Sequence, residues 1–427
     1  MSILDILSRW IIRKYQPTII GVTGSVGKTS TKDAIVTVLA AHGVRVRGSA
    51  KNYNNELGVP LTIIGASAQG ASLLGWLRVC LRAKALLIFR DRSYPKVLVL
   101  EMAADHPGDI RYLTTMAPPT IGVVTAVSPA HVETLGSLER IAREKATLVA
   151  AVPRDGLVVL NGDDTAVAAM RERARGRIRT FGFREENDVS ALEAQINARI
   201  IQEQTHVDGI TFKCSHNGSA VPVSIPGAAG NQVAYAALAA TAVGLEFGMN
   251  LIEIATALRS YVPPAGRLRV LDGIKRTMLL DDTYNASPRS AGVALDLLGA
   301  LPRAPGASAI VVLGDMLELG TMTIEEHQRV GASVAAHAIN ILVTVGEYSR
   351  DIGQGARAAG MPEDRIFHFP TSEGAGRFIQ DTLLKKSDIV LIKGSQGMRM
   401  ERIVKELMAE PLRAPELLVR QEASWTA

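Results

Sequence analysis

The feature that most restricts the fold of this chain is a glycine-rich segment, Gly21-Val-Thr-Gly-Ser-Val-Gly-Lys-Thr-Ser30. Residues 17–22 form a short apolar run rich in β-branched residues, which predicts a buried strand, and residues 28–41 have the pattern of a helix. A strand that turns through glycines into a helix directs backbone amides and the positive helix end toward one point, which favours phosphate binding. The segment therefore predicts an α/β fold that binds a nucleotide.

Each residue type in this loop suits a nucleoside triphosphate. Gly24 and Gly27 let the backbone approach the phosphates, Lys28 supplies a cation for the β- and γ-phosphates, and the Thr29 hydroxyl can hold Mg²⁺. The spacing departs from the standard loop, because the position five before Gly27 is Val22, with glycine one residue earlier. We assign nucleotide binding to Thr23, Gly24, Ser25, Val26, Gly27, Lys28, Thr29 and Ser30.

The residues after the loop alternate between strand and helix patterns. Strands are predicted at residues 97–100, 120–125 and 157–160, and helices at 138–149 and 231–243. This alternation predicts a mostly parallel sheet covered on both faces. Between residues 195 and 225, short alternating segments broken by turn residues predict a small antiparallel sub-sheet beside it.

A domain boundary is predicted at Pro263, Pro264 and Gly266, because prolines end helices and favour an extended link. Beyond it, apolar runs return at residues 277–280, 309–313, 341–345, 366–369 and 389–392, separated by helical patterns. This rhythm predicts a second, doubly wound domain of the Rossmann type. We therefore expect a P-loop ATPase-type central domain over residues 1–264, with a short N-terminal helix, and a Rossmann-like domain over residues 265–427.

Composition limits the partners and the compartment. The 47 Lys and Arg residues exceed the 42 Asp and Glu residues by only five over 427 residues, which suits small anionic substrates better than nucleic acid. The two cysteines, Cys80 and Cys214, have no ligand spacing, so a reducing cytoplasm is expected without a zinc site or disulfides. We expect a monomer.

Residues 73–89 are the longest apolar stretch, although they carry Arg78, Arg82 and Lys84. One interpretation is an amphipathic helix that covers the protein's own core, and it is favoured because most such stripes are core faces. The other is a basic helix on a membrane surface. In that case Arg78 and Arg82, four residues apart on one helical face, would meet a lipid headgroup or the anionic carrier of a substrate.

Several motifs follow one another in an order that resembles the Mur ligase family. Besides the glycine-rich loop they are Asn52-Tyr-Asn-Asn-Glu-Leu-Gly-Val-Pro60, Glu101-Met-Ala-Ala-Asp-His-Pro-Gly-Asp109, His131-Val-Glu-Thr-Leu-Gly136 with Lys145, Gly266-Arg267-Leu268, Asp281-Asp-Thr-Tyr-Asn-Ala-Ser-Pro288, Gly314-Asp-Met-Leu-Glu-Leu-Gly320 and Lys393-Gly-Ser-Gln-Gly-Met-Arg-Met-Glu401. The first two of these are similar to the branch that adds D-alanyl-D-alanine. The resemblance extends over nearly the whole chain.

The resemblance implies an ATP-dependent ligase that phosphorylates a substrate carboxylate, after which an amine attacks the acyl phosphate. Two Mg²⁺ ions would neutralise the phosphoryl charge. By resemblance, Thr29 and Glu101 hold one ion, while His131 and a carbamate on Lys145 serve the other, since carbamate oxygens suit Mg²⁺. Lys28, Glu101, His131 and Lys145 are thus the catalytic candidates. Taken alone, Lys145 would be a solvated lysine on a helix and His131 a histidine at a strand end.

Other motif residues gain expected roles from the same resemblance. Arg267 and Asn285 would face the nucleotide from the link and the second domain, and Asn231 would contact the adenine. Asn54 and Asn55 would order the substrate loop, and two asparagines in a tight turn are the structural alternative. Asp315 and His327 match family positions too, and a turn carboxylate and a helix histidine are their structural alternatives.

Departures from the family pattern leave the acceptor open. Only twenty residues precede Gly21, so we expect this chain to lack the N-terminal domain with which the branch grips the UDP end of its substrate. Gly230 and Ala234 stand where the family usually has polar residues that contact the adenine.

The preferred reaction adds a D-alanyl-D-alanine-like dipeptide to a peptidoglycan peptide precursor. The alternatives are the same chemistry on a polyglutamate-type or other cell-envelope acceptor, and a nucleotide-binding partner protein without catalysis.

Overall fold

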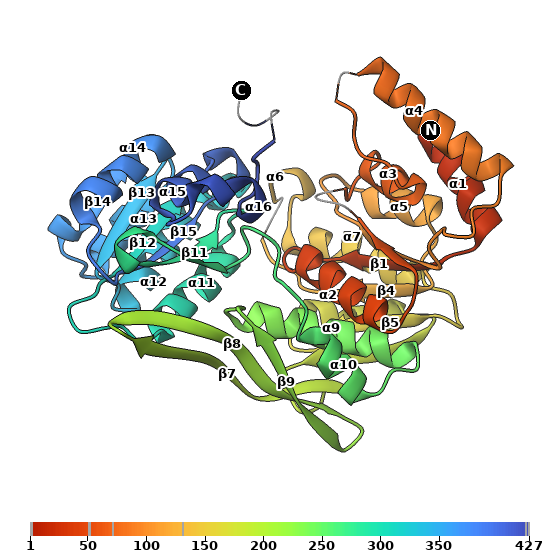
Figure 1. Cartoon of the computed structure of the whole chain (residues 1–427), viewed down its shortest axis with the longest axis horizontal. Helices are drawn as coiled ribbons and strands as arrows, with labels where there is room; N and C mark the ends of the chain where they lie inside the picture. The colour runs from red at the N-terminus through yellow and green to blue at the C-terminus, as the bar shows by residue number, and fades with distance from the viewer. Residues whose placement is uncertain (1–2, 50–52, 71, 130–131, 423–424, 426–427) are drawn as a thin grey trace.

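The computed structural model of the chain describes residues 3–49, 53–70, 72–129, 132–422 and 425. Two β-sheets lie side by side, each with its own helices, and residues 259–268 lead from one to the other (Figure 1). This is the α/β architecture that the sequence predicts. Within the described ranges, none of the helices has the length and apolar character that crossing a membrane requires.

The first sheet has nine strands in the order β2-β3-β1-β4-β5-β6-β7-β8-β9. Their bounds are β1 Thr18–Thr23, β2 Val46–Gly48, β3 Val97–Glu101, β4 Ile121–Val124, β5 Leu157–Asn161, β6 Arg177–Gly182, β7 Val189–Ile201, β8 Gln204–His216 and β9 Ser219–Pro226. Strands β2 to β7 pair in parallel, whereas β7, β8 and β9 pair antiparallel. The predicted antiparallel segment is therefore a continuation of the parallel sheet.

Helices cover both faces of this sheet. They are α1 Ile3–Tyr15, α2 Lys28–Ala41, α3 Gly58–Ile64, α4 Leu73–Ile88, α5 Asp109–Met116, α6 Val132–Leu135, α7 Leu138–Ala151, α8 Thr165–Ala168, η1 Ala169–Arg173, α9 Asn231–Glu246 and α10 Leu251–Leu258. Because successive strand residues point to opposite faces, Ile20 packs with α2, α9 and α10, while Ile19 packs with α1, α3, α4 and α5. Both faces are buried, as expected for parallel strands with continuous apolar runs.

The second sheet has six strands in the order β10-β11-β15-β12-β13-β14. They are β10 Arg269–Asp272, β11 Met278–Asp282, β12 Ala309–Gly314, β13 Ile341–Val345, β14 Ile366–Phe369 and β15 Ile389–Lys393. All pair in parallel except the edge strand β10. The helices are α11 Pro288–Ala300, α12 Thr323–Ala336, α13 Arg350–Ala358, α14 Ser372–Phe378, α15 Glu401–Leu407 and α16 Ala414–Leu417, with short turns η2 Ile274–Arg276, η3 Gly320–Met322, η4 Glu363–Arg365, η5 Ile379–Leu383, η6 Gln396–Met398 and η7 Pro411–Arg413.

The β7–β8 hairpin reaches beneath the second sheet, where Figure 1 shows it running below α11 and α12. Ile196, Ala198 and Val207 pack against the apolar core of the second sheet. At the end of the hairpin, the Thr205 hydroxyl donates to the carbonyl of Pro302 at 2.8 Å. The two sheets are therefore held together by packing as well as by the connecting segment.

Candidate active site

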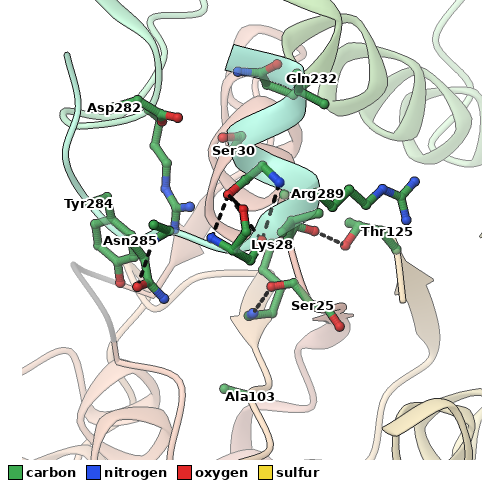
Figure 2. Close-up of a pocket in the computed structure, with 18 of the residues that line it drawn as sticks. Ser25, Lys28, Ser30, Ala103, Thr125, Gln232, Asp282, Tyr284, Asn285 and Arg289 are labelled. Atoms are coloured by element: carbon green, nitrogen blue, oxygen red, sulfur yellow. Dashed lines mark hydrogen bonds between the residues drawn. The ribbon is translucent and has the colours of Figure 1, made fainter. Parts of the chain in front are cut away.

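A cavity of about 760 Å³ lies where the carboxyl ends of the two sheets face each other. The glycine-rich loop lines it from the first sheet, and the segments after β11, β12 and β15 line it from the second. Figure 2 shows Ser25, Lys28 and Thr125 in the same cavity as Tyr284, Asn285 and Arg289. Ligands of parallel α/β sheets bind at this edge, because the loops that carry variable side chains meet there.

The glycine-rich loop is held in shape by the end of strand β4. The Thr125 hydroxyl donates to the carbonyl of Val26 at 2.6 Å, and the Ser25 amide donates to the carbonyl of Ala126 at 2.8 Å. At Gly24, with φ at +151°, an added Cβ would lie 1.9 Å from the Thr125 hydroxyl oxygen. The loop is therefore preorganised, and only glycine fits at position 24.

Lys28 begins helix α2 and folds back over the loop. Its Nζ donates to the carbonyl of Gly24 at 2.7 Å. Loss of hydration lowers the pKa of Lys28, the Glu101 carboxylate opposes that shift, and Arg267 adds to it. An ammonium group that has lost hydration has much to gain from a polyphosphate.

Glu101 ends strand β3 beside the start of α2. The Thr29 hydroxyl donates to its Oε2 at 3.0 Å, and the Asn54 amide donates to its Oε1 at 3.4 Å. Glu101 and Thr29 are both buried. Within the described ranges, no cluster of three or more His, Cys, Asp or Glu side chains is arranged for a metal ion. A carboxylate and a hydroxyl next to a phosphate site are nevertheless the kind of oxygen donors that Mg²⁺ uses together with phosphates.

Lys145 lies on α7 and only 3% of its surface is exposed. Burial, assisted by the nearby charge of Lys28, lowers the pKa of Lys145 to about 7, while Glu144 and Asp105 act in the opposite direction. Its charged sequence neighbours would suggest that Lys145 is a solvated surface residue, and this interpretation is therefore wrong. His131, predicted to act with Lys145, lies outside the described residues.

The second sheet contributes a stacked pair and a buried ion pair. The Arg267 guanidinium lies over the Tyr284 ring, 3.8 Å from its centroid. Lys393 donates to Asp282 Oδ2 at 2.7 Å and to the carbonyl of Asn285 at 2.8 Å, which fixes the segment that follows β11. These contacts place Arg267 and Asn285 on the cavity wall opposite the loop.

Three other sequence candidates make contacts within the fold. Asn55 orders the turn that leads into α3, since its Oδ1 accepts from the amides of Leu57 and Gly58, and Asn55 also lines the cavity. Asp315 accepts from the amides of Glu347 and Ser349 after β13. His327 is buried, and its Nε2 accepts from the Met316 amide.

The predicted site residues thus fall into three groups. Those lining the cavity are Ser25, Val26, Gly27, Lys28, Ser30, Asn54, Asn55, Glu101, Asn231, Arg267 and Asn285. Thr23, Gly24, Thr29 and Lys145 lie behind this lining, and His131 is not described. Thr23, for instance, donates its hydroxyl proton to the carbonyl of Met102 at 2.7 Å.

The sequence prediction missed several lining residues. They are Thr125, Asn161, Phe181, Gln232, Tyr235, Asp282, Arg289 and Lys393. Asp282 and Lys393 stand inside motifs that carry the family resemblance, and Thr125 ends a predicted strand, so a position-by-position reading had a signal for them. Gln232 and Tyr235 follow Asn231 on helix α9. The sequence of this helix is largely apolar, so it gave no signal that these two side chains line the cavity.

Comparison with known proteins identifies the family to which these sheets correspond. The family model described as the Mur ligase middle domain matches residues 22–74 and 83–244. The model described as Mur ligase, glutamate ligase domain, matches residues 266–396. Together these matches cover most of the chain and both sheets.

Individual relatives agree with the family models. The UDP-N-acetylmuramoyl-tripeptide–D-alanyl-D-alanine ligase of Mycobacterium tuberculosis is 34% identical over 92% of this chain and 73% of its own length. The ligase of that name from Bacillus subtilis is 28% identical over 96% of this chain and 80% of its own. A crystal structure of MurF ligase from Thermotoga maritima in complex with ADP has a TM-score of 0.74 and 25% identity, covering 94% of this chain and 82% of that one.

Proposed function

The chain belongs to the Mur ligase family, and on this premise we propose that it adds D-alanyl-D-alanine to the peptide of a peptidoglycan precursor. Its activity is that of an ATP-dependent, ADP-forming peptide ligase. The acceptor we propose is a nucleotide-sugar peptide with a free carboxylate, the substrate that its relatives' names indicate. The observation that carries the proposal is the shared cavity of the glycine-rich loop, Glu101 and Asn54.

The proposed reaction has two steps. An acceptor carboxylate oxygen attacks the γ-phosphorus of ATP, the bond to the ADP oxygen breaks, and an acyl phosphate forms. The amine of the dipeptide then attacks the acyl carbon, inorganic phosphate leaves, and the amine loses a proton as the amide forms. Lys28 is positioned to neutralise charge on the transferring group, and the amides at the start of α2 to hold the phosphates.

Magnesium fits the donors beside the loop. Thr29 and Glu101 are buried, adjacent oxygen donors, which would hold one ion next to the phosphates. When bound, the ion would neutralise phosphoryl charge during transfer. We assign a second ion to His131 and Lys145.

We further propose that Lys145 is carbamylated. Only a neutral amine adds to CO₂, and a pKa of about 7 leaves a large neutral fraction at physiological pH. The product is an anion, so it would replace the repulsion between Lys145 and Lys28 with attraction. If so, Lys145→Ala is inactive and is partly restored by formate or acetate, whereas Lys145→Arg is inactive and not restored.

The remaining site residues have proposed roles in binding. Thr23, Gly24, Ser25, Val26, Gly27 and Ser30 would form the phosphate cradle, with Asn231, Arg267 and Asn285 on the nucleoside side. Asn54 and Asn55 would order the acceptor. We propose that residues 1–264 and 265–427 act as two domains, which close on ATP and complete the site.

The test measures ADP release with purified protein and ATP while the acceptor and the dipeptide are varied. UDP-N-acetylmuramoyl-tripeptide with D-alanyl-D-alanine should give ADP, phosphate and the pentapeptide product in equal amounts. Turnover only with a polyglutamate-type acceptor would replace the proposed substrate and keep the chemistry. ATP binding without turnover on any acceptor would favour the non-catalytic alternative.

We also propose that the protein is a cytoplasmic monomer and that residues 73–89 make peripheral contact with a membrane.

A further inference from the structure

Helix α4 is apolar on two opposite sides. One side, with Val79, Ala83 and Leu86, is buried against the helices that cover the first sheet. The other side exposes Leu73, Leu74, Leu77, Leu81 and Ile88, each between 53% and 86% accessible, and Phe89 continues it at 70%. The favoured sequence interpretation, a helix that covers the core, thus explains only half of the apolar residues of α4.

The exposed leucines form one continuous stripe. At 3.6 residues per turn, Leu73, Leu74, Leu77, Leu81 and Ile88 fall within an arc of about 100° on the helix surface. A surface helix of a globular protein usually has one apolar side, so a second apolar side that the protein's own core leaves uncovered needs another partner. Contiguous exposed apolar surface of this kind marks an interaction site.

The charged side chains of α4 itself are all cations. Lys84 lies within the same arc and Arg78 at its border, and Arg90 follows the end of the helix; all three side chains are exposed. Between Glu56 and Asp91 the sequence contains no Asp or Glu. An apolar stripe with cations and no anions is complementary to an anionic lipid surface, where the cations meet headgroups and the leucines enter the acyl boundary.

The stripe is presented on a fixed support. The side chain of Lys14 donates to the carbonyls of Leu86, Leu87 and Phe89 at 2.8–2.9 Å, so α1 satisfies the open carbonyls at the end of α4. Figure 1 shows the two helices together at the corner away from the second sheet. The family model that matches the first sheet also leaves out residues 75–82, the middle of α4.

We infer that α4 docks this protein on an anionic phospholipid bilayer. The inference deepens the membrane contact included in the proposed function, and it does not depend on the ligase reaction. The helix lies flat, with Leu73, Leu77 and Leu81 in the interface and Lys84 extended along the stripe to the headgroups. Arg82 takes a different role, because its Nε donates to the carbonyl of Ile64 at 3.0 Å and braces α4 against α3.

The test is flotation of the full chain with vesicles of phosphatidylcholine, with and without phosphatidylglycerol. We expect binding to the anionic vesicles that weakens as salt is added. The pair Leu77→Glu and Leu81→Glu should abolish binding. The matched control is Ile252→Glu with Leu412→Glu, two apolar residues 67% and 95% exposed elsewhere, and it should bind like the wild type. Arg78→Gln with Lys84→Gln should weaken binding about fivefold per charge.

Each other outcome overturns the inference. No flotation of the wild type, equal flotation with both kinds of vesicle, or equal loss in the control pair would remove anionic lipid as the occupant. A wild-type dimer in sedimentation velocity that the leucine pair converts to monomer would assign the stripe to a second copy of the chain. ADP release in vesicle-free solution should be the same for all variants, so failure of the ligase assay is separate from failure of flotation.

Discussion

Arg289 of α11 spans the cavity between the two sheets, and its Nη1 donates to Asp164 Oδ2, in the loop after β5, at 2.7 Å. The same Nη1 donates to the carbonyl of Val127 at 3.1 Å. Asp164 is also engaged by the amides of Val127, Ala166 and Val167, so it is part of the local fold. The arginine is therefore the member of the pair that can be removed without unfolding the first sheet.

Arg289→Gln should lower kcat/KM for ATP about tenfold, the equivalent of one charged hydrogen bond of about 1.5 kcal/mol that favours the closed cavity. The free energy of unfolding should fall by less than about 1 kcal/mol, because the Arg289 side chain is 41% exposed. Steady-state kinetics and thermal unfolding check the two parts. Arg413→Gln, which removes surface ion pairs with Glu410 and Glu416, is the control and should leave kcat/KM unchanged.

Lys28→Ala should reduce acceptor-dependent ADP release by about 10³-fold, since charge on the transferring phosphoryl group is no longer neutralised. Stability should not fall, because burial already disfavours the charged lysine, as its lowered pKa indicates. A coupled ADP assay and urea unfolding measure the two quantities. Wild-type turnover in this variant would remove the loop from the mechanism.

Lys145 should make the free energy of unfolding depend on pH. Its pKa is about 7 in the folded protein and 10.5 in the unfolded chain, so between these values the unfolded state holds one more proton. Stability therefore rises with pH across that window, by up to a few kcal/mol, and the cost of burying the cation is complete below pH 7. Lys145→Met should remove this rise in urea unfolding without nucleotide in CO₂-free buffer. Parallel curves for the two proteins would contradict the burial of a lysine with a lowered pKa.

Gly24→Ala should weaken ATP binding and destabilise the loop by about 2–3 kcal/mol, because the new methyl group and Thr125 cannot occupy the same space. Gly108→Ala is the control. Its φ is also positive, at +98°, yet nothing lies within 4 Å of the added Cβ, so only backbone strain of about 1 kcal/mol is expected. Isothermal titration with ATP and thermal unfolding compare the two. Equal losses of ATP affinity and stability at both positions would mean that backbone strain, and not the contact with Thr125, causes the effect of Gly24→Ala.

The sequence predicts the regular elements of this fold well where apolar runs are long. Strand β13 and helix α2 have the predicted bounds. Strands β2, β6 and β10 were not predicted, because they are short or carry polar residues such as the exposed Arg177 and the half-buried Arg179. Period and apolar content give no signal for an edge strand of four residues like β10.

The sequence could predict those site residues that belong to a recognisable motif. The neighbouring positions of Thr29 and Glu101 follow from the carboxyl ends of adjacent parallel strands, β1 and β3. Arg289 could not be found, because its partner Asp164 is 125 positions away in the chain. The burial of Lys145 is also a tertiary property, since its sequence neighbours Arg143 and Glu144 are charged.

The β7–β8 hairpin determines how the two sheets can turn relative to each other. It meets the second sheet through Thr205 and Pro302, at a different point from the covalent crossing at residues 259–268. Rotation about the line that joins these two points would disturb them least, while it would separate Arg289 from Asp164 across the cavity. Sliding would require Ile196 and Val207 to leave an apolar core. The length of the β7–β8 hairpin therefore fixes one end of that line, and a shorter or longer hairpin would move it.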